Sequence, residues 1–352
     1  MRLRVLQAMA GAAQGGAERF FERLVPALQA AGVDQTALIR PAPGRAERLA
    51  LAGVPTRTTR FGGPLDLLSR RRFADQIAQT RPHAVVVWMS RAAACLPRLA
   101  GPDRPILIGR LGGHYPLRHY RRCDHLVGNT PVIRDWLIGQ GWPAERAHCL
   151  PNFAAEAGAA PVSRAMLGVP DGAPLLVALG RLHPNKAFDV AIDALALMPG
   201  VHLAIAGAGA EEGALRARAG EAGVAGRVHW LGWREDAPAL IATADVVLVP
   251  SRIEPLGNVV LEAWAGTRPV VAARADGPVG LIRDGVDGLL VPREDPAALA
   301  HAARRVLGDA GFAAGLATAG HRRHLDEFSP AAITARWQAF LEEVTPCAAS
   351  PD

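Results

Sequence analysis

The chain has 352 residues and a formal net charge of +6, and half of its residues are hydrophobic while one fifth are charged. This composition is globular and excludes an intrinsically disordered chain, and the length exceeds what one hydrophobic core usually serves, so we expect two domains. No apolar run approaches the ~20 residues that a membrane-spanning helix needs. The short apolar segment at the N-terminus is better read as a first strand than as a secretion signal, so we expect a cytoplasmic protein.

The first half of the chain alternates strand-like and helix-like segments. An apolar strand over 2–8 precedes a helix over 17–30, which has apolar residues at helical spacing and is closed by Gly32. Four more strands are expected, over 33–40, 83–89, 104–110 and 125–129. Near-continuous apolar strands that alternate with helices predict a parallel sheet covered on both faces.

The second half repeats this pattern after a linker over 150–172 that is rich in Ala, Gly and Pro. Six further strands are expected, over 173–180, 201–209, 227–232, 244–251, 267–274 and 287–292. An amphipathic helix over 330–344 ends the pattern. The predicted fold class is therefore α/β, with two doubly wound Rossmann-like domains, 1–152 and 153–329, that face a cleft at the carboxyl ends of their strands.

The segment from Glu254 to Glu262 carries the first functional signal. A buried strand ends at Ser251, a short loop follows, and Gly257 and Asn258 open a helix whose N-terminus offers free backbone N–H groups to an anion such as phosphate. Two carboxylates at this place can accept hydrogen bonds from the hydroxyls of a sugar. Taken alone, however, the two glutamates are better explained as a solvated loop residue and a helix-surface residue.

A pair of cations adds weight to this segment. Arg181 ends a predicted strand and Lys186, the only lysine among 39 basic residues, begins the next helix. A cation at a helix N-terminus opposes the helix dipole, which favours a bound anion over a chance surface pair. Both side chains can neutralise a pyrophosphate and the charge that develops when it leaves.

Glycine-rich turns follow two of the predicted strands. Gly207 and Gly209, with Glu211, resemble a mononucleotide-binding turn, and Gly15 and Gly16 follow the first strand in a similar way. Each turn is a weak signal by itself, because a glycine in a tight turn needs no ligand to explain it.

Together these motifs resemble glycosyltransferase family 4, the retaining enzymes of the GT-B fold, and the resemblance covers the whole chain. It rests on Gly15-Gly16, the linker near Pro151-Asn152, the turn from Gly180 to Lys186, the turn from Gly207 to Glu211, the Glu254-x7-Glu262 signature and the segment over 284–291, read as a hairpin. The resemblance implies that domain 1–152 binds the acceptor, that 153–329 binds the nucleotide-sugar donor, and that a C-terminal helix over 330–346 packs back on the first domain.

The resemblance also implies roles for individual residues. Arg181 and Lys186 would bind the donor diphosphate, Glu254 would contact the donor sugar, and Glu262 would hold the ribose hydroxyls. His114 would lie near the transferred sugar. The remaining donor contacts would come from the backbone amides of Leu256, Gly257 and Asn258 and from a border of the base formed by Leu231, Trp233 and Arg234.

The sequence departs from the family pattern at two places. The usual Lys-Gly is Lys186-Ala187, which matters only where φ is positive, and Leu256 replaces a frequent aromatic residue before Gly257. No Asp-x-Asp motif occurs, so we expect no metal and no cofactor, with the cations in the place of a metal. The resemblance implies a front-face transfer with retained anomeric configuration, in which the leaving phosphate takes the acceptor proton.

The expected partners are a nucleotide-sugar donor and a glycan or glycolipid acceptor, in cell-envelope polysaccharide or lipopolysaccharide assembly. Short arginine clusters at 70–72, 118–122 and 322–323 come with no nucleic-acid motif, so we expect no nucleic-acid partner and consider an anionic membrane surface instead. This alternative would place the protein peripherally at the inner face of the cytoplasmic membrane. Three functional alternatives stay open, namely an inactive nucleotide-sugar-binding relative, a GT-B epimerase and a phosphorylase.

Overall fold

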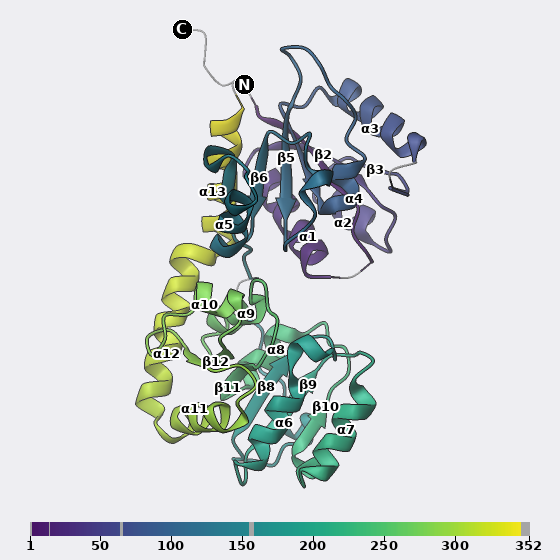
Figure 1. Ribbon diagram of the computed structural model, residues 1–352. Helices are drawn as coiled ribbons and strands as arrows, with labels where there is room; N and C mark the ends of the chain where they lie inside the picture. Colours follow the sequence, from purple (N-terminus) through teal and green to yellow (C-terminus); the bar gives the residue numbers. More distant parts are fainter. Residues whose placement is uncertain (1, 14, 64–65, 155–157, 346–352) are drawn as a thin grey trace. The chain divides into compact units, whose positions relative to one another are not determined.

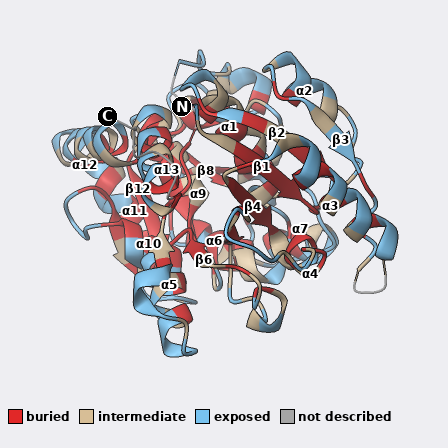
Figure 2. Ribbon diagram, turned by 90° about the horizontal axis from the view of Figure 1, so that it is seen from above, coloured by how far each residue is buried: buried red, intermediate tan, exposed pale blue. Residues whose placement is uncertain are grey.

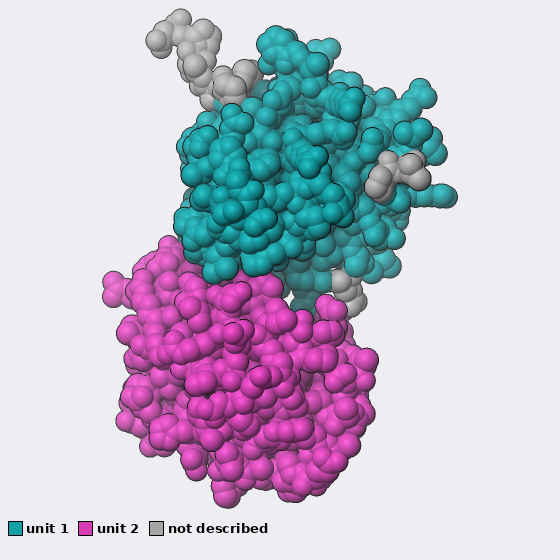
Figure 3. All heavy atoms as spheres, viewed as in Figure 1, with its two compact units in different colours: residues 1–152, 330–352 teal, residues 153–329 magenta. Residues whose placement is uncertain are grey.

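The computed structural model describes residues 2–13, 15–63, 66–154 and 158–345. The chain divides into two compact units, one made of Met1–Asn152 with Pro330–Asp352 and the other of Phe153–Ser329 (Figure 3). The expected helix over 330–346 is observed as α13 (Pro330–Val344) in unit 1, and residue 346 lies outside the described residues.

Unit 1 is built on a parallel sheet of seven strands in the order β3-β2-β1-β4-β5-β6-β7 (Figure 1). The strands are β1 (Arg4–Met9), β2 (Asp34–Ile39), β3 (Thr56–Thr58), β4 (Ala84–Trp88), β5 (Ile106–Leu111), β6 (His125–Gly128) and β7 (Ala147–Cys149). The helices besides α13 are α1 (Gly16–Ala30), α2 (Arg45–Leu51), α3 (Leu67–Thr80), α4 (Met89–Ala94) and α5 (Pro131–Gly139), with 3-10 turns η1 (Leu117–His119) and η2 (Ala144–Arg146).

Unit 2 is built on a second parallel sheet, of six strands in the order β10-β9-β8-β11-β12-β13. The strands are β8 (Leu175–Leu179), β9 (His202–Ala206), β10 (Val228–Trp230), β11 (Val246–Val249), β12 (Val270–Ala273) and β13 (Leu289–Val291). The helices are α6 (Phe188–Ala196), α7 (Glu212–Glu221), α8 (Ala237–Thr243), α9 (Asn258–Ala265), α10 (Asp276–Leu281), α11 (Pro296–Gly308) and α12 (Ala310–Arg323), with short turns η3 (Arg164–Leu167), η4 (Pro184–Lys186), η5 (Ala225–Arg227) and η6 (His324–Phe328).

Helices cover the sheets, so strands such as β1 and β4 are buried (red in Figure 2), which explains their near-continuous apolar sequences. In β8, Leu176 and Ala178 pack under α6, α7 and α11, while Leu175 and Val177 face α8 and α9 on the other side. In unit 1, α13 lies against α1, and its Trp337 stacks on Trp88 of β4 with ring centroids 6.3 Å apart. The predicted fold class is confirmed for both units.

The structure also corrects the sequence interpretation at three places. Strands β3 and β7 were not expected, because each has only three residues, includes polar ones, and lies at an edge of the sheet. The strand expected over 83–89 ends at Trp88, since Met89 has a φ of 72° and begins α4. The segment over 284–291 is not a hairpin: a turn closes between Asp284 and Gly288, and β13 then pairs in parallel with β12.

No helix in the described part of the chain is long and apolar enough to cross a membrane.

Candidate functional site

The predicted donor-site residues of unit 2 gather at one edge of its sheet. Loops that carry them follow β8, β9 and β11, and β8 lies between the other two strands. All strands are parallel, so their carboxyl ends meet at the same edge, which is where ligands bind in doubly wound sheets. The loop after β8 carries Arg181 and Lys186, the loop after β9 carries Gly207 and Glu211, and the loop after β11 carries Glu254.

Lys186 and Glu254 meet directly at this edge. The Lys186 ammonium donates to Glu254 Oε2, and the two side chains are 24% and 11% exposed. The same carboxylate accepts from Ser251 Oγ at 3.3 Å and, through Oε1, from the backbone N–H of Gly257 at 3.4 Å. Glu254 is therefore placed between a cation and the N-terminus of α9.

Two helices begin at this edge through residues with left-handed backbone. Gly257 precedes α9 with a φ of 87°, and Ala187 precedes α6 with a φ of 52°. Glycine adopts this conformation freely, whereas alanine pays a steric cost of about 1–2 kcal/mol. The departure from Lys-Gly to Lys186-Ala187 therefore falls on a position where φ is positive, and it does matter.

The glycines after β9 are required by close backbone contact with the loop after β8. A Cβ at position 207 would lie closer than 3.0 Å to the carbonyl oxygen of Gly180, and one at 209 would lie equally close to that of Leu182. The two loops are joined by hydrogen bonds from Gly180 N to Ala206 O and from Leu182 N to Ala208 O, both 3.0 Å. These glycines thus position the Arg181 loop, whatever their role toward a ligand.

A fourth loop, after β10, carries the residues expected near the base. Gly232 O accepts from Gly207 N at 2.7 Å, so this loop adjoins the one after β9. Trp233 is 45% exposed, Leu231 is half-buried, and Arg234 forms a bidentate ion pair with Asp236, 2 residues away. The hydrogen bonds from Arg234 hold the pKa of Asp236 below its ordinary value.

The remaining predicted residues of unit 2 lie along α9 and beside it. Asn258 is the first residue of α9, Glu262 is half-buried about one turn into this helix, and Leu256 is buried. Arg181 is exposed and has no ion-pair partner among the described residues.

Sequence reasoning missed the residues that support the Glu254 loop. Gly277 in α10 donates its N–H to Glu254 O at 2.8 Å, and a Cβ there would collide with the backbone of Leu256. Arg252 binds Asp189 at the start of α6 through two hydrogen bonds of 2.9 and 2.6 Å. Burial would raise the pKa of Asp189, but the bonds from Arg252 outweigh it and hold this pKa below its ordinary value. An Arg two residues before the signature glutamate was the only available signal.

The predicted residues of unit 1 lie at the carboxyl edge of its own sheet. Gly15 caps α1, and a Cβ there would collide with the buried carboxylate of Glu18, which accepts from Ala12 N at 2.7 Å. Gly16 is the exposed first residue of α1, and His114 is exposed and stacks on Trp136 with ring centroids 4.8 Å apart.

A buried arginine lies under this edge of unit 1. Arg110, at the end of β5, is 2% exposed, stacks over Phe20 and Trp88, and donates to Asn152 Oδ1. Burial lowers the pKa of its guanidinium to about 10. Its place in the packed interior indicates that it holds the end of unit 1 at Asn152 in position.

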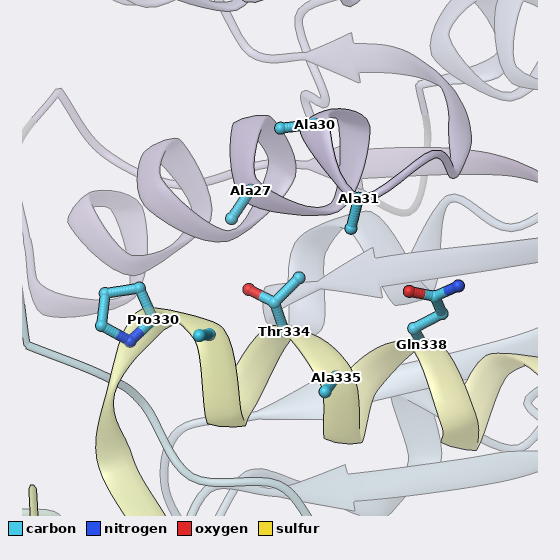
Figure 4. Close-up of a pocket in the computed structure, with 8 residues that line it drawn as sticks. Ala27, Ala30, Ala31, Pro330, Thr334, Ala335 and Gln338 are labelled. Carbon is cyan, nitrogen blue, oxygen red and sulfur yellow. The ribbon is translucent and has the colours of Figure 1, made fainter. Parts of the chain in front are cut away.

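A shallow groove elsewhere in unit 1 does not involve the predicted residues. It runs between α1 and α13 and is lined by small side chains such as Ala27, Ala31 and Ala335, with Thr334 and Gln338 along one wall (Figure 4). Such a row of alanines is explained by close helix packing and carries no chemistry.

The fold and the edge geometry together define a protein of the two-domain, doubly wound GT-B class. The family model described as "Glycosyl transferase 4-like domain" matches residues 15–152, and that described as "Glycosyl transferases group 1" matches residues 173–309. The chain is 38% identical over 325 residues to the lipopolysaccharide core biosynthesis glycosyltransferase LpsE of Rhizobium meliloti (strain 1021), which covers 91% of this chain and 94% of the relative. It is 34% identical over 329 residues to LpsD of the same organism, with coverage of 91% and 93%.

Solved structures show the same fold at low sequence identity. The structure of Anabaena Alr3699/HepE in complex with UDP and glucose superposes with a TM-score of 0.82 at 21% identity, covering 97% of this chain and 100% of that one. WaaG, a glycosyltransferase involved in lipopolysaccharide biosynthesis, gives a TM-score of 0.67 at 17% identity, covering 98% and 100%. The chain belongs to the glycosyltransferases of family 4 with the GT-B fold, and the resemblance predicted from its motifs is confirmed.

Proposed function

We propose that this glycosyltransferase moves a sugar from a nucleotide-diphosphate sugar to a glycan or glycolipid acceptor, with retention of anomeric configuration and without a metal. The observation that carries the proposal is the meeting of Lys186 and Glu254 at the N-terminus of α9. A cation, a carboxylate and a helix N-terminus at one edge suit a ligand that is anionic at one end and rich in hydroxyls at the other.

In this proposal, different side chains of unit 2 bind different parts of the donor. Lys186 and Arg181 bind the diphosphate and stabilise the charge that grows on it as the glycosidic bond breaks. Glu254 accepts from hydroxyls of the transferred sugar, and Glu262 accepts from the ribose hydroxyls. The backbone amides at Leu256, Gly257 and Asn258 complete the contacts with sugar and phosphate, and Leu231, Trp233 and Arg234 border the base.

Unit 1 supplies the acceptor side in this proposal. His114 lies in an exposed loop beyond β5 and contacts the sugar as it is transferred, while Gly15 and Gly16 let the backbone at the start of α1 approach the donor phosphate. The incoming hydroxyl attacks the face that the nucleotide leaves, and the departing phosphate oxygen takes its proton. The acceptor oxygen forms the new bond to the anomeric carbon as the bond to the phosphate breaks, so no protein nucleophile is needed.

The names of two relatives support an assignment of the acceptor. Two proteins that match nearly the whole chain are lipopolysaccharide core biosynthesis glycosyltransferases. We therefore assign the acceptor to the core oligosaccharide of a lipopolysaccharide, or to a precursor of it.

A panel of UDP-, GDP- and ADP-sugars tests the proposal. We expect one nucleotide class to raise the melting temperature, and the matching sugar to be transferred to a lipopolysaccharide core acceptor with metal chelator present. Incubation with the nucleotide-sugar alone separates an epimerase, which converts it, from a transferase, which hydrolyses it slowly at most. An inactive relative is recognised because it binds the nucleotide-sugar but transfers no sugar when the acceptor is present. Stabilisation by none of the three classes would overturn the assignment of the donor site.

The charge distribution supports a peripheral place at an anionic membrane on the cytoplasmic side. Residues 66–122 contain eleven arginines and three aspartates, whereas the rest of the chain holds 28 basic and 30 acidic residues. Arg70 donates a hydrogen bond to Ala94 O. Its neighbours Arg71 and Arg72 are exposed on α3. The same helix begins with Leu67 and Leu68, whose side chains are each 73% exposed. Such a surface suits anionic headgroups with some insertion of apolar side chains.

Vesicle sedimentation tests this membrane proposal. The full chain should sediment with vesicles of phosphatidylglycerol and phosphatidylethanolamine, and the exchange of Arg71 and Arg72 for glutamate should release it. The matched control exchanges two exposed arginines of α11, Arg304 and Arg305, with the same change of charge. Equal loss in both double variants would point to net charge rather than to the surface on α3.

A further inference from the structure

Arg252 lies outside the predicted donor contacts, yet its side chain joins three segments around them. Its Nη1 donates to Pro184 O at 2.8 Å, its Nη1 and Nη2 bind both oxygens of Asp189 at 2.9 and 2.6 Å, and its Nε binds Glu294 at 2.6 Å. Acceptors on a turn (Pro184), at the start of a helix (Asp189) and in a distant loop (Glu294) thus bind one planar guanidinium. The fixed fork of N–H donors in arginine can bind all three at once, whereas the single ammonium of lysine cannot.

The backbone at the same position adds a second tie. Asn185 O accepts from the N–H groups of Arg252 and Ile253, at 2.9 and 3.2 Å. Arg293 in turn donates to Arg252 O at 3.3 Å. The turn that carries Lys186 is therefore fastened to the loop that carries Glu254 by both main chain and side chain.

The hydrogen bonds of Arg252 join residues that lie close in sequence to Lys186 and Glu254. Arg252 lies two residues before Glu254, and its acceptor Pro184 lies two residues before Lys186. Asp189 lies three residues after Lys186, so Arg252 binds acceptors both before and after Lys186 in the sequence. The side chains of Arg252 and Asp189 are each 29% exposed, which leaves the pair partly shielded from water.

We propose that Arg252 is a positioning residue of the donor site, which holds Lys186 and Glu254 in the mutual geometry that binds the diphosphate and the sugar. It acts through these two residues and does not touch the donor. This inference rests on the proposed function, because it assumes that Lys186 contacts the diphosphate.

A neighbouring ion pair offers a matched control. Arg218 of α7 binds both oxygens of Asp193, which lies on α6 one turn beyond Asp189. This pair ties another helix to α6 with the same chemistry, but neither residue is bonded to the Lys186 turn or to the Glu254 loop. A loss of stability alone should affect the two arginine sites alike, whereas a positioning role should affect only Arg252.

The test measures donor kinetics and the binding of a nucleoside diphosphate in Arg252→Ala, Arg252→Lys and Arg218→Ala. The probe is whichever of UDP, GDP and ADP stabilises the wild-type protein. We expect Arg252→Ala to weaken binding and to lower kcat/KM for the donor by about 10- to 100-fold, as displaced catalytic groups do. Arg252→Lys should recover part of this loss, and Arg218→Ala should keep wild-type values. If Arg252→Ala does not fold, Asp189→Asn removes one charged acceptor of the clamp and should show a smaller loss of the same kind.

A double-mutant cycle with Lys186→Ala separates positioning from a general effect on the fold. If Arg252 acts through Lys186, adding Arg252→Ala to Lys186→Ala should weaken nucleoside diphosphate binding less than it does in the wild type. Full additivity of the two losses, or a loss in Arg218→Ala equal to that in Arg252→Ala, would overturn the inference. Unchanged binding in Lys186→Ala alone would instead overturn the proposed function, so the two failures are distinguishable.

Discussion

Lys186 and Glu254 are 68 residues apart in the chain and form an ion pair at the carboxyl edge of the unit 2 sheet. Their meeting follows from topology, because β8 and β11 are neighbours and each sends its loop to the same edge. The consequence is that the cation proposed for the diphosphate is already neutralised by the carboxylate proposed for the sugar. Donor binding must therefore share or break this pair.

Replacement of the lysine should remove most of the activity while the fold survives. In Lys186→Ala, the leaving diphosphate loses a positioned cation, so we expect turnover to fall by about two to three orders of magnitude. The two side chains are only 24% and 11% exposed, so loss of the lysine should also lower stability, by about 1–3 kcal/mol, while Ser251 and the Gly257 N–H still donate to Glu254. Steady-state kinetics beside thermal unfolding measure the two effects, and near-normal turnover would refute the leaving-group role.

Replacement of the glutamate should have opposite effects on binding and transfer. Glu254→Gln keeps the shape of the side chain but replaces the ion pair with Lys186 by a weaker hydrogen bond to a neutral amide. We expect a nucleoside diphosphate without sugar to bind about two- to fivefold more tightly, since a partly exposed pair is worth up to ~1 kcal/mol. Sugar transfer should fall, because the amide is a weaker acceptor for sugar hydroxyls than a carboxylate. Calorimetry and kinetics measure both effects.

The matched control for this change is Asp193→Asn. Asp193 of α6 pairs with Arg218 of α7, and among the described residues neither member of this pair is bonded to the Lys186 turn or to the Glu254 loop. Its replacement should leave nucleotide binding unchanged. Weaker binding of the nucleoside diphosphate in Glu254→Gln would show that the carboxylate assists the diphosphate rather than competing for Lys186.

The sequence predicted the strands that are long and apolar, and with them the fold class. Strands such as β4 and β11 are fully buried, so their composition alone marks them. The short strands β3 and β7 carry no such pattern and could not be predicted. The order of the strands in the sheet, which brings Lys186 to Glu254 rather than to another loop, is not visible in the sequence either. The role of Arg252 was equally hidden, because its acceptors lie in segments that only the folded sheet brings together.

The backbone of Ala187 leads to a prediction on stability. Ala187 and Ala191 are both fully buried at the start of α6, but only Ala187 has a positive φ. Ala191→Gly loses a packed methyl group and helix propensity, whereas Ala187→Gly offsets the lost methyl by relief of strain. We therefore expect Ala187→Gly to be at least about 1 kcal/mol less destabilising than Ala191→Gly in urea unfolding. Equal losses would show that Ala187 is not strained.

Two glycines of unit 2 should respond in opposite ways to alanine. At Gly207 the added Cβ meets the carbonyl of Gly180, which belongs to a hydrogen-bonded loop and cannot move alone. We expect Gly207→Ala to cost about 3 kcal/mol or more and to weaken nucleotide binding. At Gly213, in α7, the Cβ meets nothing within 4 Å, so Gly213→Ala should stabilise by about 0.5–1 kcal/mol. Thermal unfolding and nucleotide titration measure both variants.

His324 should make the stability of unit 2 depend on pH. Its ring is 1% exposed, and neither ring nitrogen has a hydrogen-bond partner among the described residues. Burial, and then the nearby His321, lowers the pKa of His324 from 6.5 to about 4. Between these two values the unfolded chain binds a proton that the folded chain does not, so stability is present at pH 7 and is lost as the pH falls from about 6.5 toward 4.

The size of this effect should be about 2–3 kcal/mol, since one unit of pKa corresponds to about 1.4 kcal/mol. Urea unfolding at pH 7 and pH 4.5 measures it, with His324→Leu as the test and the exposed His301→Leu as the control. Burial also lowers the pKa of half-buried histidines such as His148 and His229, which shifts the wild-type curve in the same direction, so the informative quantity is the difference between variants. We expect the leucine at 324 to reduce the loss on acidification, while the control keeps it. An equal loss in both variants would place the pH dependence in the other histidines or carboxylates.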